Sequence, residues 1–363
     1  MKRVEPGLIV GSTRIIFARS NALLSIQTLR LNQRAVGLVT VCALFYEDCI
    51  NMYRNRHHAF TLIETLVVLV VIAVLTLLII GAVLQAREAA RRSQCLNNMR
   101  QLAIAINAHL DQKKYYPRGE NNYSAFVSML PFLENGPLYN SINLAKPRFS
   151  FMMPSDVNET AFSTHLNVFV CPSEGTPDVG LGPSTYGGNR GTGVGRYGSP
   201  DNGPFASSLL DPAIRDALVR DGLANTVAIS EFCRNRGFSN RQENRAVFQL
   251  ESFGKSQYSQ MIDKCNSVDI HKSPLSIVNR GWCWGFDGIQ NTLYDHNIVP
   301  NGHTCSPGGG SLAGAWTASS AHAGGVNCVH LDGHVTTVEY SVSISVWRSL
   351  GTMNGGEITN SEN

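Results

Sequence analysis

A run of nineteen uncharged residues, Leu66 to Leu84, constrains this chain more than any other feature. At 1.5 Å per residue, about 20 apolar residues cross the hydrocarbon core of a bilayer as one helix. A buried helix of a soluble protein is normally shorter, and the apolar core of a cleaved signal peptide spans only ~7 to 15 residues. The run therefore predicts a single transmembrane helix.

The helical pattern continues beyond this run. Apolar residues recur every three or four positions, which places them on one helical face: Leu96, Met99, Ala103, Ile106 and Leu110. Tyr115 and Tyr116 are followed by Pro117, which cannot continue a helix. We expect a transmembrane helix over residues 60–84 and an amphipathic stalk helix over 85–114, whose apolar face packs against the rest of the chain.

Residues 115–363 are rich in Gly, Pro and Ser and contain short apolar runs, a pattern typical of an antiparallel sheet with long loops. The strand-like runs are Leu166–Val170, Thr226–Ile229, Ala246–Leu250 and Val326–Tyr340. Asp332-Gly333 predicts a two-residue hairpin turn inside the last run, with positive φ at both residues. Val342, Val346 and Leu350 predict a short terminal helix that ends at Gly351. The expected fold class is α+β, a long N-terminal helix packed on an antiparallel β-sheet head domain.

The positive charge lies at the front of the chain. The sequence has 30 Lys+Arg and 27 Asp+Glu, but residues 1–59 carry a net charge of +5 and residues 60–363 a net charge of −2. A strongly basic nucleic-acid binder and a long disordered chain are both excluded by this balance and by the low charged fraction of 16%. We expect no nucleic-acid partner.

A basic segment, Arg54 to Ala59, is followed directly by Phe60-Thr61-Leu62-Ile63-Glu64 and then by the apolar run. Here the sequence resembles the type IV pilins and the type II secretion pseudopilins, which have a short basic leader, a small residue (usually Gly), Phe-Thr-Leu-Ile-Glu and a hydrophobic helix. The resemblance implies a prepilin peptidase that cleaves between Ala59 and Phe60 and N-methylation of Phe60. Ala59 stands where the family normally has Gly, and we still expect processing because Ala is the next smallest side chain.

Met52 to Ala59 alone would make a complete leader of the pilin kind. We therefore expect translation to start at Met52, with an unusually long leader from Met1 as the alternative. In either case residues 1–59 are expected to be absent from the mature protein.

Glu64 is a carboxylate at the edge of the apolar run, where such a group normally faces a partner. The pilin resemblance implies that Glu64 pairs with the terminal ammonium of Phe60 in a neighbouring subunit. The alternative is a carboxylate that reaches into the lipid headgroups.

The charges around the span and the leader motif indicate opposite orientations in the membrane. Arg54 and Arg56 closely precede the span and four arginines follow it, so the positive-inside rule would place the C-terminal side in the cytoplasm. The leader motif requires the N-terminus at the cytoplasmic face, where the peptidase acts. We give the motif precedence and expect a single-pass protein of the cytoplasmic (inner) membrane with its head outside the cytoplasm.

Shorter motifs narrow the resemblance to one bacterial group of pilin-like proteins of unknown function, which has a C-terminal pattern of His, nine residues and Asp-Gly. The matching residues are His322, Gly325, Asn327, Asp332 and Gly333, together with Cys171 and Pro172. This group has no established activity to carry over to the chain.

Seven of the nine cysteines follow residue 59, and an exported head is oxidised, so disulfides are expected. The preferred pair is Cys95 with Cys171, because both lie in motifs that resemble the group. No two cysteines have Cys-x-x-Cys spacing, and His322, His330 and His334 do not follow an established zinc pattern. We expect no metal and no cofactor, with calcium bound through Asp332, Asp221 and Glu231 as the alternative.

The sequence contains no Gly-x-Ser-x-Gly, His-Glu-x-x-His or phosphate-loop motif. The function expected is therefore not enzymatic. It is a pseudopilin-like subunit of a filament or of a type II secretion-like assembly, with the prepilin peptidase, other pilin-like subunits and the lipid bilayer as partners. The alternatives are a helix-tethered module that binds carbohydrate or another ligand, and an anchored hydrolase.

Overall fold

The computed structural model describes residues 61–146, 157–177, 181–193, 201–205, 213–235, 244–251, 257–307 and 314–356. The expected cleavage site between Ala59 and Phe60, and the expected start at Met52, lie outside these residues.

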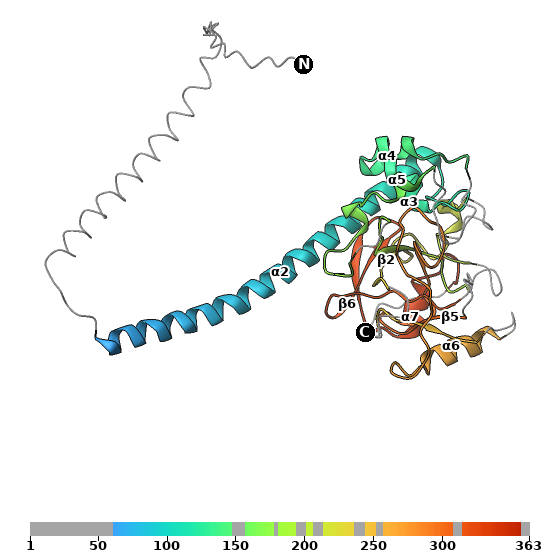
Figure 1. Ribbon diagram of the computed structural model, residues 1–363. Helices are drawn as coiled ribbons and strands as arrows, with labels where there is room; N and C mark the ends of the chain where they lie inside the picture. The colour runs from blue at the N-terminus through green and yellow to red at the C-terminus, as the bar shows by residue number, and fades with distance from the viewer. Residues whose placement is uncertain are drawn as a thin grey trace, which may run out of the picture. The chain divides into compact units, whose positions relative to one another are not determined.

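One unbroken helix, α2, spans Leu62–Lys113 and contains 52 residues (Figure 1). Its first turn is closed by a capping box, in which the Glu64 carboxylate accepts hydrogen bonds from the Thr61 backbone N–H (2.9 Å) and the Thr61 hydroxyl (3.0 Å). It ends where Lys114 adopts a left-handed conformation, with a φ of +66°. This one helix thus covers both of the expected helical segments, from Leu62 to Lys113.

The chain divides into two units between Ile79 and Ile80. Every residue from 61 to 87 is exposed. Among the described residues, α2 alone is long and apolar enough to cross a membrane, and its apolar part is not buried against any other described segment.

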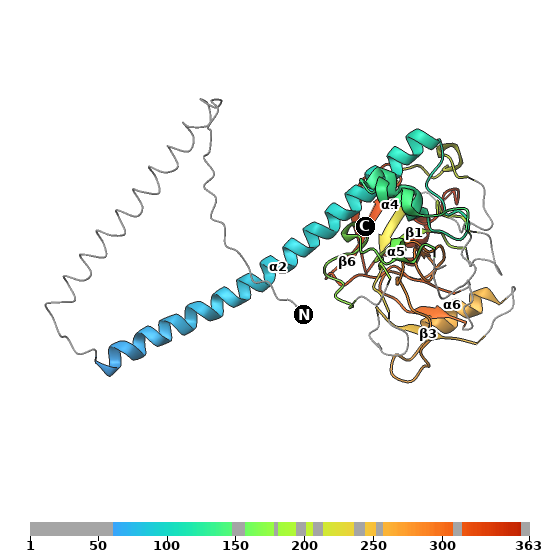
Figure 2. The same ribbon diagram turned by 45° about the horizontal axis from the view of Figure 1, so that its top comes forward.

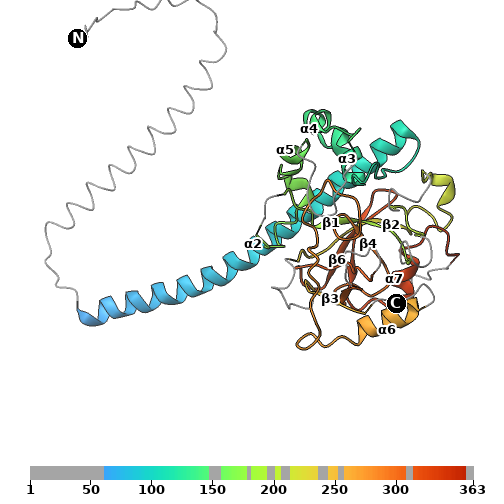
Figure 3. The ribbon, with the colours of Figure 1, turned by 45° about the vertical axis from the view of Figure 1, so that its right-hand side comes forward.

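The second half of α2 belongs to the head unit and buries one face: Cys95, Asn98, Met99, Leu102, Ala103, Ala105, Ile106 and His109. The expected stripe is confirmed by Met99, Ala103 and Ile106, while Leu96 and Leu110 are half-buried at its edges. The apolar members of this face share one core with Phe126, Phe169, Trp284, Ala228 and Ile229. Figure 3 shows the second half of α2 beside the strands of the head. The stalk helix is therefore part of the head's own core.

The head contains a five-stranded sheet in the order β4-β1-β2-β6-β7. The strands are β1 (Tyr186–Asn189), β2 (Val227–Glu231), β4 (Leu293–Tyr294), β6 (Gly325–His330) and β7 (Val335–Glu339). Three of the four pairings are antiparallel, as expected, and β1 with β4 is parallel. A second pair, β3 (Val247–Gln249) with β5 (Thr304–Ser306), is also parallel. Both parallel pairs join segments far apart in sequence, whose long connections leave either direction open.

Short helices complete the head. They are α3 (Ala125–Met129), η1 (Leu130–Leu133), α4 (Gly136–Ser141), α5 (Glu159–Phe162), η2 (Asn167–Phe169), η3 (Asp216–Leu218), α6 (Tyr258–Asn266) and α7 (Ile344–Ser349). Figures 1 and 3 show α3, α4 and α5 beside the C-terminal part of α2, and Figure 2 shows α4 and α5 there. The expected terminal helix is confirmed as α7, and Ser343 caps it by accepting a hydrogen bond from the Val346 N–H.

The prediction of a strand over Leu166–Val170 was wrong, because this segment forms the short helix η2. The side-chain amide of Asn98 on α2 donates to the carbonyls of Asn167 (2.9 Å) and Val170 (3.0 Å). These carbonyl groups are therefore satisfied by the stalk helix, not by a neighbouring strand.

The hairpin between β6 and β7 is confirmed, but its expected two-residue turn was wrong. The His330 N–H donates to the His334 carbonyl (2.9 Å), which leaves a loop of three residues between them. Of Asp332 and Gly333, only Gly333 has a positive φ, at +94°. A three-residue loop of this kind requires one left-handed residue, and glycine supplies it.

Candidate functional site

The stalk helix is covalently joined to the head. Cys95 on α2 and Cys171, two residues after η2, form a disulfide with an S–S distance of 1.99 Å and a Cα–Cα distance of 4.9 Å. Both cysteines are buried. This is the pair that the sequence motifs favoured, and it fixes the first buried turn of α2 to the head. Pro172, which follows Cys171, is exposed.

His322 of the C-terminal motif lies directly against this disulfide. Its Nε2 is 3.3 Å from Cys171 Sγ, and its Nδ1 is 3.0 Å from Oε1 of Glu88 on α2. Glu88 also accepts hydrogen bonds from Arg91 (2.9 Å) and from the Ser173 hydroxyl (3.2 Å). We call Glu88, Cys95, Cys171, Ser173 and His322 the stalk–head junction.

The charge of Glu88 is stabilised at this junction. Its slight burial favours the neutral acid, but hydrogen bonds from Arg91, His322 and Ser173 outweigh that effect and lower its pKa. A lowered carboxylate pKa adds stability above the ordinary pKa, and this stability is lost as the pH falls. The junction is therefore strongest with Glu88 ionised.

The other motif residues shape the β6–β7 hairpin and do not converge with His322. A Cβ on Gly325 would lie 2.4 Å from the Val338 carbonyl oxygen, so no larger residue fits there. The Asn327 side-chain oxygen accepts from the Thr337 hydroxyl (2.8 Å). Asp332 accepts from the His334 N–H (3.0 Å), which makes it a turn residue.

The carboxylates considered for calcium have separate partners. Asp221 accepts from the backbone N–H groups of Gly355 (2.7 Å) and Gly356 (3.0 Å), and Glu231 accepts from that of Asn327 (2.8 Å). Asp332 belongs to the hairpin. Within the described ranges, one group of three potential metal ligands lies together, Cys95, Cys171 and His322, but its two sulfurs are bonded to each other and are not thiolates.

A second disulfide, Cys265–Cys305, joins α6 to β5. The other three described cysteines, Cys233, Cys283 and Cys328, are buried and stand outside both disulfides. Nothing in the sequence distinguished the bonded cysteines, Cys265 and Cys305, from these three.

Glu231, at the end of β2, is a buried carboxylic acid. Burial raises its pKa from 4.5 to about 7, although hydrogen bonds from Asn327 and Ser320 favour the charged form. The folded chain thus keeps a proton that the unfolded chain has lost between pH 4.5 and about 7, so stability falls as the pH rises through this window.

Replacing Glu231 by Gln is expected to remove this pH dependence, because Gln is neutral and can still accept the Asn327 N–H. Above pH 7 the variant should be more stable than the wild type by on the order of 1–3 kcal/mol. Urea unfolding of the full chain in detergent at pH 5 and pH 8 measures this. A wild type equally stable at both values would contradict the buried acid.

A family model described as "protein of unknown function (DUF1559)" matches residues 84–344. The chain belongs to the DUF1559 family. A second model, the prokaryotic N-terminal methylation motif, matches residues 54–80. Comparison with curated proteins and with solved structures gives no match.

In this DUF1559 protein, the boundary between the two family matches lies close to the boundary between the two compact units of the chain. The methylation motif ends at residue 80, the family domain begins at residue 84, and the two compact units meet between Ile79 and Ile80. The motif and the exposed apolar helix make this DUF1559 protein a membrane-anchored, prepilin-type subunit. The family itself has no assigned biochemical activity.

Glu88 and Ser173 were not predicted from the sequence as junction residues of the DUF1559 protein, although the spacing of Glu88 from Cys95 could have indicated its contact with the head. Glu88 and Cys95 are seven positions apart, which is two helical turns, so they share a face of α2. A carboxylate on the face that carries a buried cysteine indicates a contact with the head.

Proposed function

We propose that this protein is a structural subunit, pseudopilin-like, that assembles through its N-terminal helix into a filament or a type II secretion-like complex. The observation that carries the proposal is the first part of α2, which is apolar on all sides and has no partner within the described chain. The lipid bilayer surrounds this apolar surface before assembly, and the helices of other subunits pack against it afterwards. The proposed role is structural, not catalytic, and needs no cofactor.

The contact proposed between subunits is an ion pair at the start of the helix. Cleavage between Ala59 and Phe60 would create an ammonium group four positions before Glu64. Within one chain the Glu64 carboxylate is held by Thr61 and is fully exposed, so it is accessible to the ammonium of a neighbour. Opposite charges gain most where water is scarce, as at the edge of a membrane.

The proposed location is the cytoplasmic membrane, with the head outside the cytoplasm. Two disulfides in the head support this orientation, because disulfides persist in oxidising compartments and are rare in the cytosol. The arginines after the span favour the opposite orientation by charge alone. We give more weight to the two disulfides and to the processing motif, because both favour a head outside the cytoplasm.

Photo-crosslinking in cells tests the assembly. A crosslinking residue in place of Leu69, which is 66% exposed on α2, should give a ladder of covalent multimers. The matched control carries the same residue at Leu218, which is 49% exposed on the head. A ladder from neither position, or from Leu218 alone, would count against assembly through the helix.

A further inference from the structure

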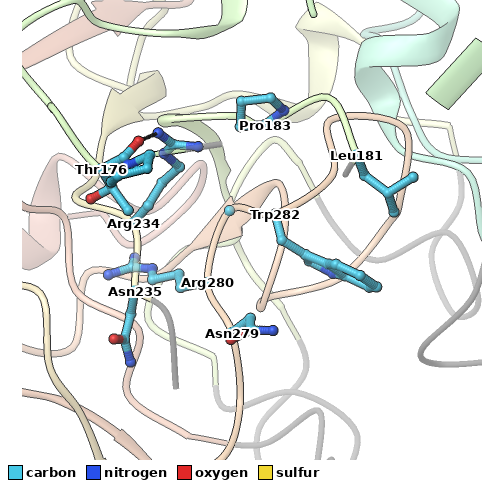
Figure 4. A pocket seen from close by; sticks show the side chains of 10 residues that line it. Thr176, Leu181, Pro183, Arg234, Asn235, Asn279, Arg280 and Trp282 are labelled. Atoms are coloured by element: carbon cyan, nitrogen blue, oxygen red, sulfur yellow. Dashed lines mark hydrogen bonds between the residues drawn. The ribbon is translucent and has the colours of Figure 1, made fainter. Parts of the chain in front are cut away.

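The head contains a pocket of about 350 Å³ that has no part in the stalk–head junction. Figure 4 shows its two unlike sides. Leu181, Pro183 and Trp282 form an apolar side, and Arg234, Asn235 and Arg280 form a polar one. Its volume is near the lower end of the range for small-molecule sites, so it suits a ligand of about one ring.

Arg280 is a buried cation whose hydrogen-bond acceptors, among the described residues, are neutral. Its guanidinium donates to the Thr304 hydroxyl (3.2 Å) and to the Thr317 carbonyl (2.7 Å), and it lies 4.4 Å from the centre of the Phe232 ring. Burial lowers its pKa to about 10, although Cys233 and Asp295 act in the opposite direction. Within the described ranges no carboxylate forms an ion pair with Arg280, and its Nε has no hydrogen-bond partner.

The surroundings of Arg280 add further positive charge. Arg234 pairs with Glu174 (2.8 Å), and Arg245 pairs with the same carboxylate. One buried glutamate thus pairs with two arginines, whereas Arg280 forms no ion pair with any described carboxylate. The charge of Asp295 acts on Arg280 only from beyond ion-pair distance. A buried, unpaired guanidinium is costly, and a bound carboxylate relieves this cost through charge-assisted hydrogen bonds.

Asn235 adds groups that suit hydroxyls. It is 3% exposed, and neither its side-chain oxygen nor its nitrogen has a hydrogen-bond partner in the part of the chain that the structure describes. A side-chain amide both donates and accepts, as a sugar hydroxyl requires. Across the pocket the half-buried Trp282 offers an aromatic surface of the kind that packs against a ring.

We propose that this pocket binds an acidic sugar, a hexuronate as a free molecule or as the end unit of a polysaccharide. Its carboxylate lies toward Arg280, its ring packs on Trp282, and its hydroxyls bond to Asn235. The proposal adds a ligand for the head and does not depend on assembly through the helix.

Calorimetric titration of the full chain in detergent tests the proposal, with glucuronate, glucose and inorganic phosphate as probes. Glucuronate should saturate the protein with a Kd of about 1 mM or tighter, and glucose should bind at least tenfold more weakly because it lacks the carboxylate. Phosphate has charge but no ring, and it should also bind at least tenfold more weakly.

Two variants locate the site. Trp282→Ala, at a half-buried position, should weaken glucuronate binding about tenfold, and Arg280→Gln should abolish it. Ile277→Ala, exposed and outside the pocket lining, is the matched control and should bind as the wild type does. If Arg280→Gln does not fold, Trp282→Ala decides alone. No saturable glucuronate binding, equal binding of phosphate, or unchanged binding in Trp282→Ala would overturn the proposal.

Discussion

Replacing Glu64 by Ala is expected to abolish subunit assembly while leaving the protein in the membrane. Loss of the carboxylate would leave the Phe60 ammonium of a neighbouring subunit without its counter-charge, and breaking such a pair away from water costs about 3–5 kcal/mol. Membrane anchoring should not change, because the apolar residues from Leu66 onward are untouched. The measurement is the crosslinked ladder from position 69, together with fractionation of the membranes.

The capping box requires a matched control, because Glu64→Ala also removes the hydrogen bonds to Thr61. Glu64→Gln keeps a side chain that can cap the helix but carries no charge. If the ion pair matters, Gln should fail to assemble just as Ala does. Normal assembly of Glu64→Gln would mean that Glu64 acts through its own helix and not through a neighbour.

Removing the Cys95–Cys171 disulfide is expected to cause the largest loss of head stability. The bond closes a loop with a sequence separation of 76, for which the chain-entropy model gives about 4.5 kcal/mol. Its loss also removes the support for His322 and hence for the contact with Glu88. Urea unfolding of the double variant Cys95→Ser, Cys171→Ser should show a clearly lower midpoint than the wild type.

Hydrogen exchange separates this effect from a general loss of stability. The matched control is Cys265→Ser, Cys305→Ser, whose disulfide has a separation of 40 and belongs to a different core cluster. Residues 95–109 of α2 should lose protection in the first double variant and keep it in the second. Equal protection of this segment in both variants would contradict a specific role of the junction disulfide.

Much of the fold could be predicted because its signals are local. The apolar run, the stripe through Met99, Ala103 and Ile106, and the Asp-Gly pair each reflect the periodicity or turn chemistry of one element. Short strands carry no such signal, since β4 contains two residues and β5 three, too few to show alternation. The run Leu166–Val170 was wrongly predicted to be a strand, because its carbonyl groups accept hydrogen bonds from Asn98, about 70 positions earlier in the sequence.

The stalk–head junction and the pocket beside Arg280 are formed by contacts between residues far apart in sequence, and such contacts are hard to predict from the sequence. Cys95 and Cys171 could be paired because each lies in a recognisable motif, whereas Cys265 and Cys305 lie in none. His322 could be singled out, but its partner Glu88 is 234 positions away. Arg280 could not be found at all, because its significance is the lack of an ion-pair partner in the described part of the fold.

Mass spectrometry of the mature N-terminus determines whether the leader is removed by prepilin-type processing. In the proposed pathway, the subunit enters a helix-mediated assembly with Phe60 as its first residue. The expected result is an N-terminal peptide that begins with methylated Phe60 and contains none of residues 1–59. A protein isolated from membranes with residues 52–59 still attached, or with an unmethylated start elsewhere, would contradict it.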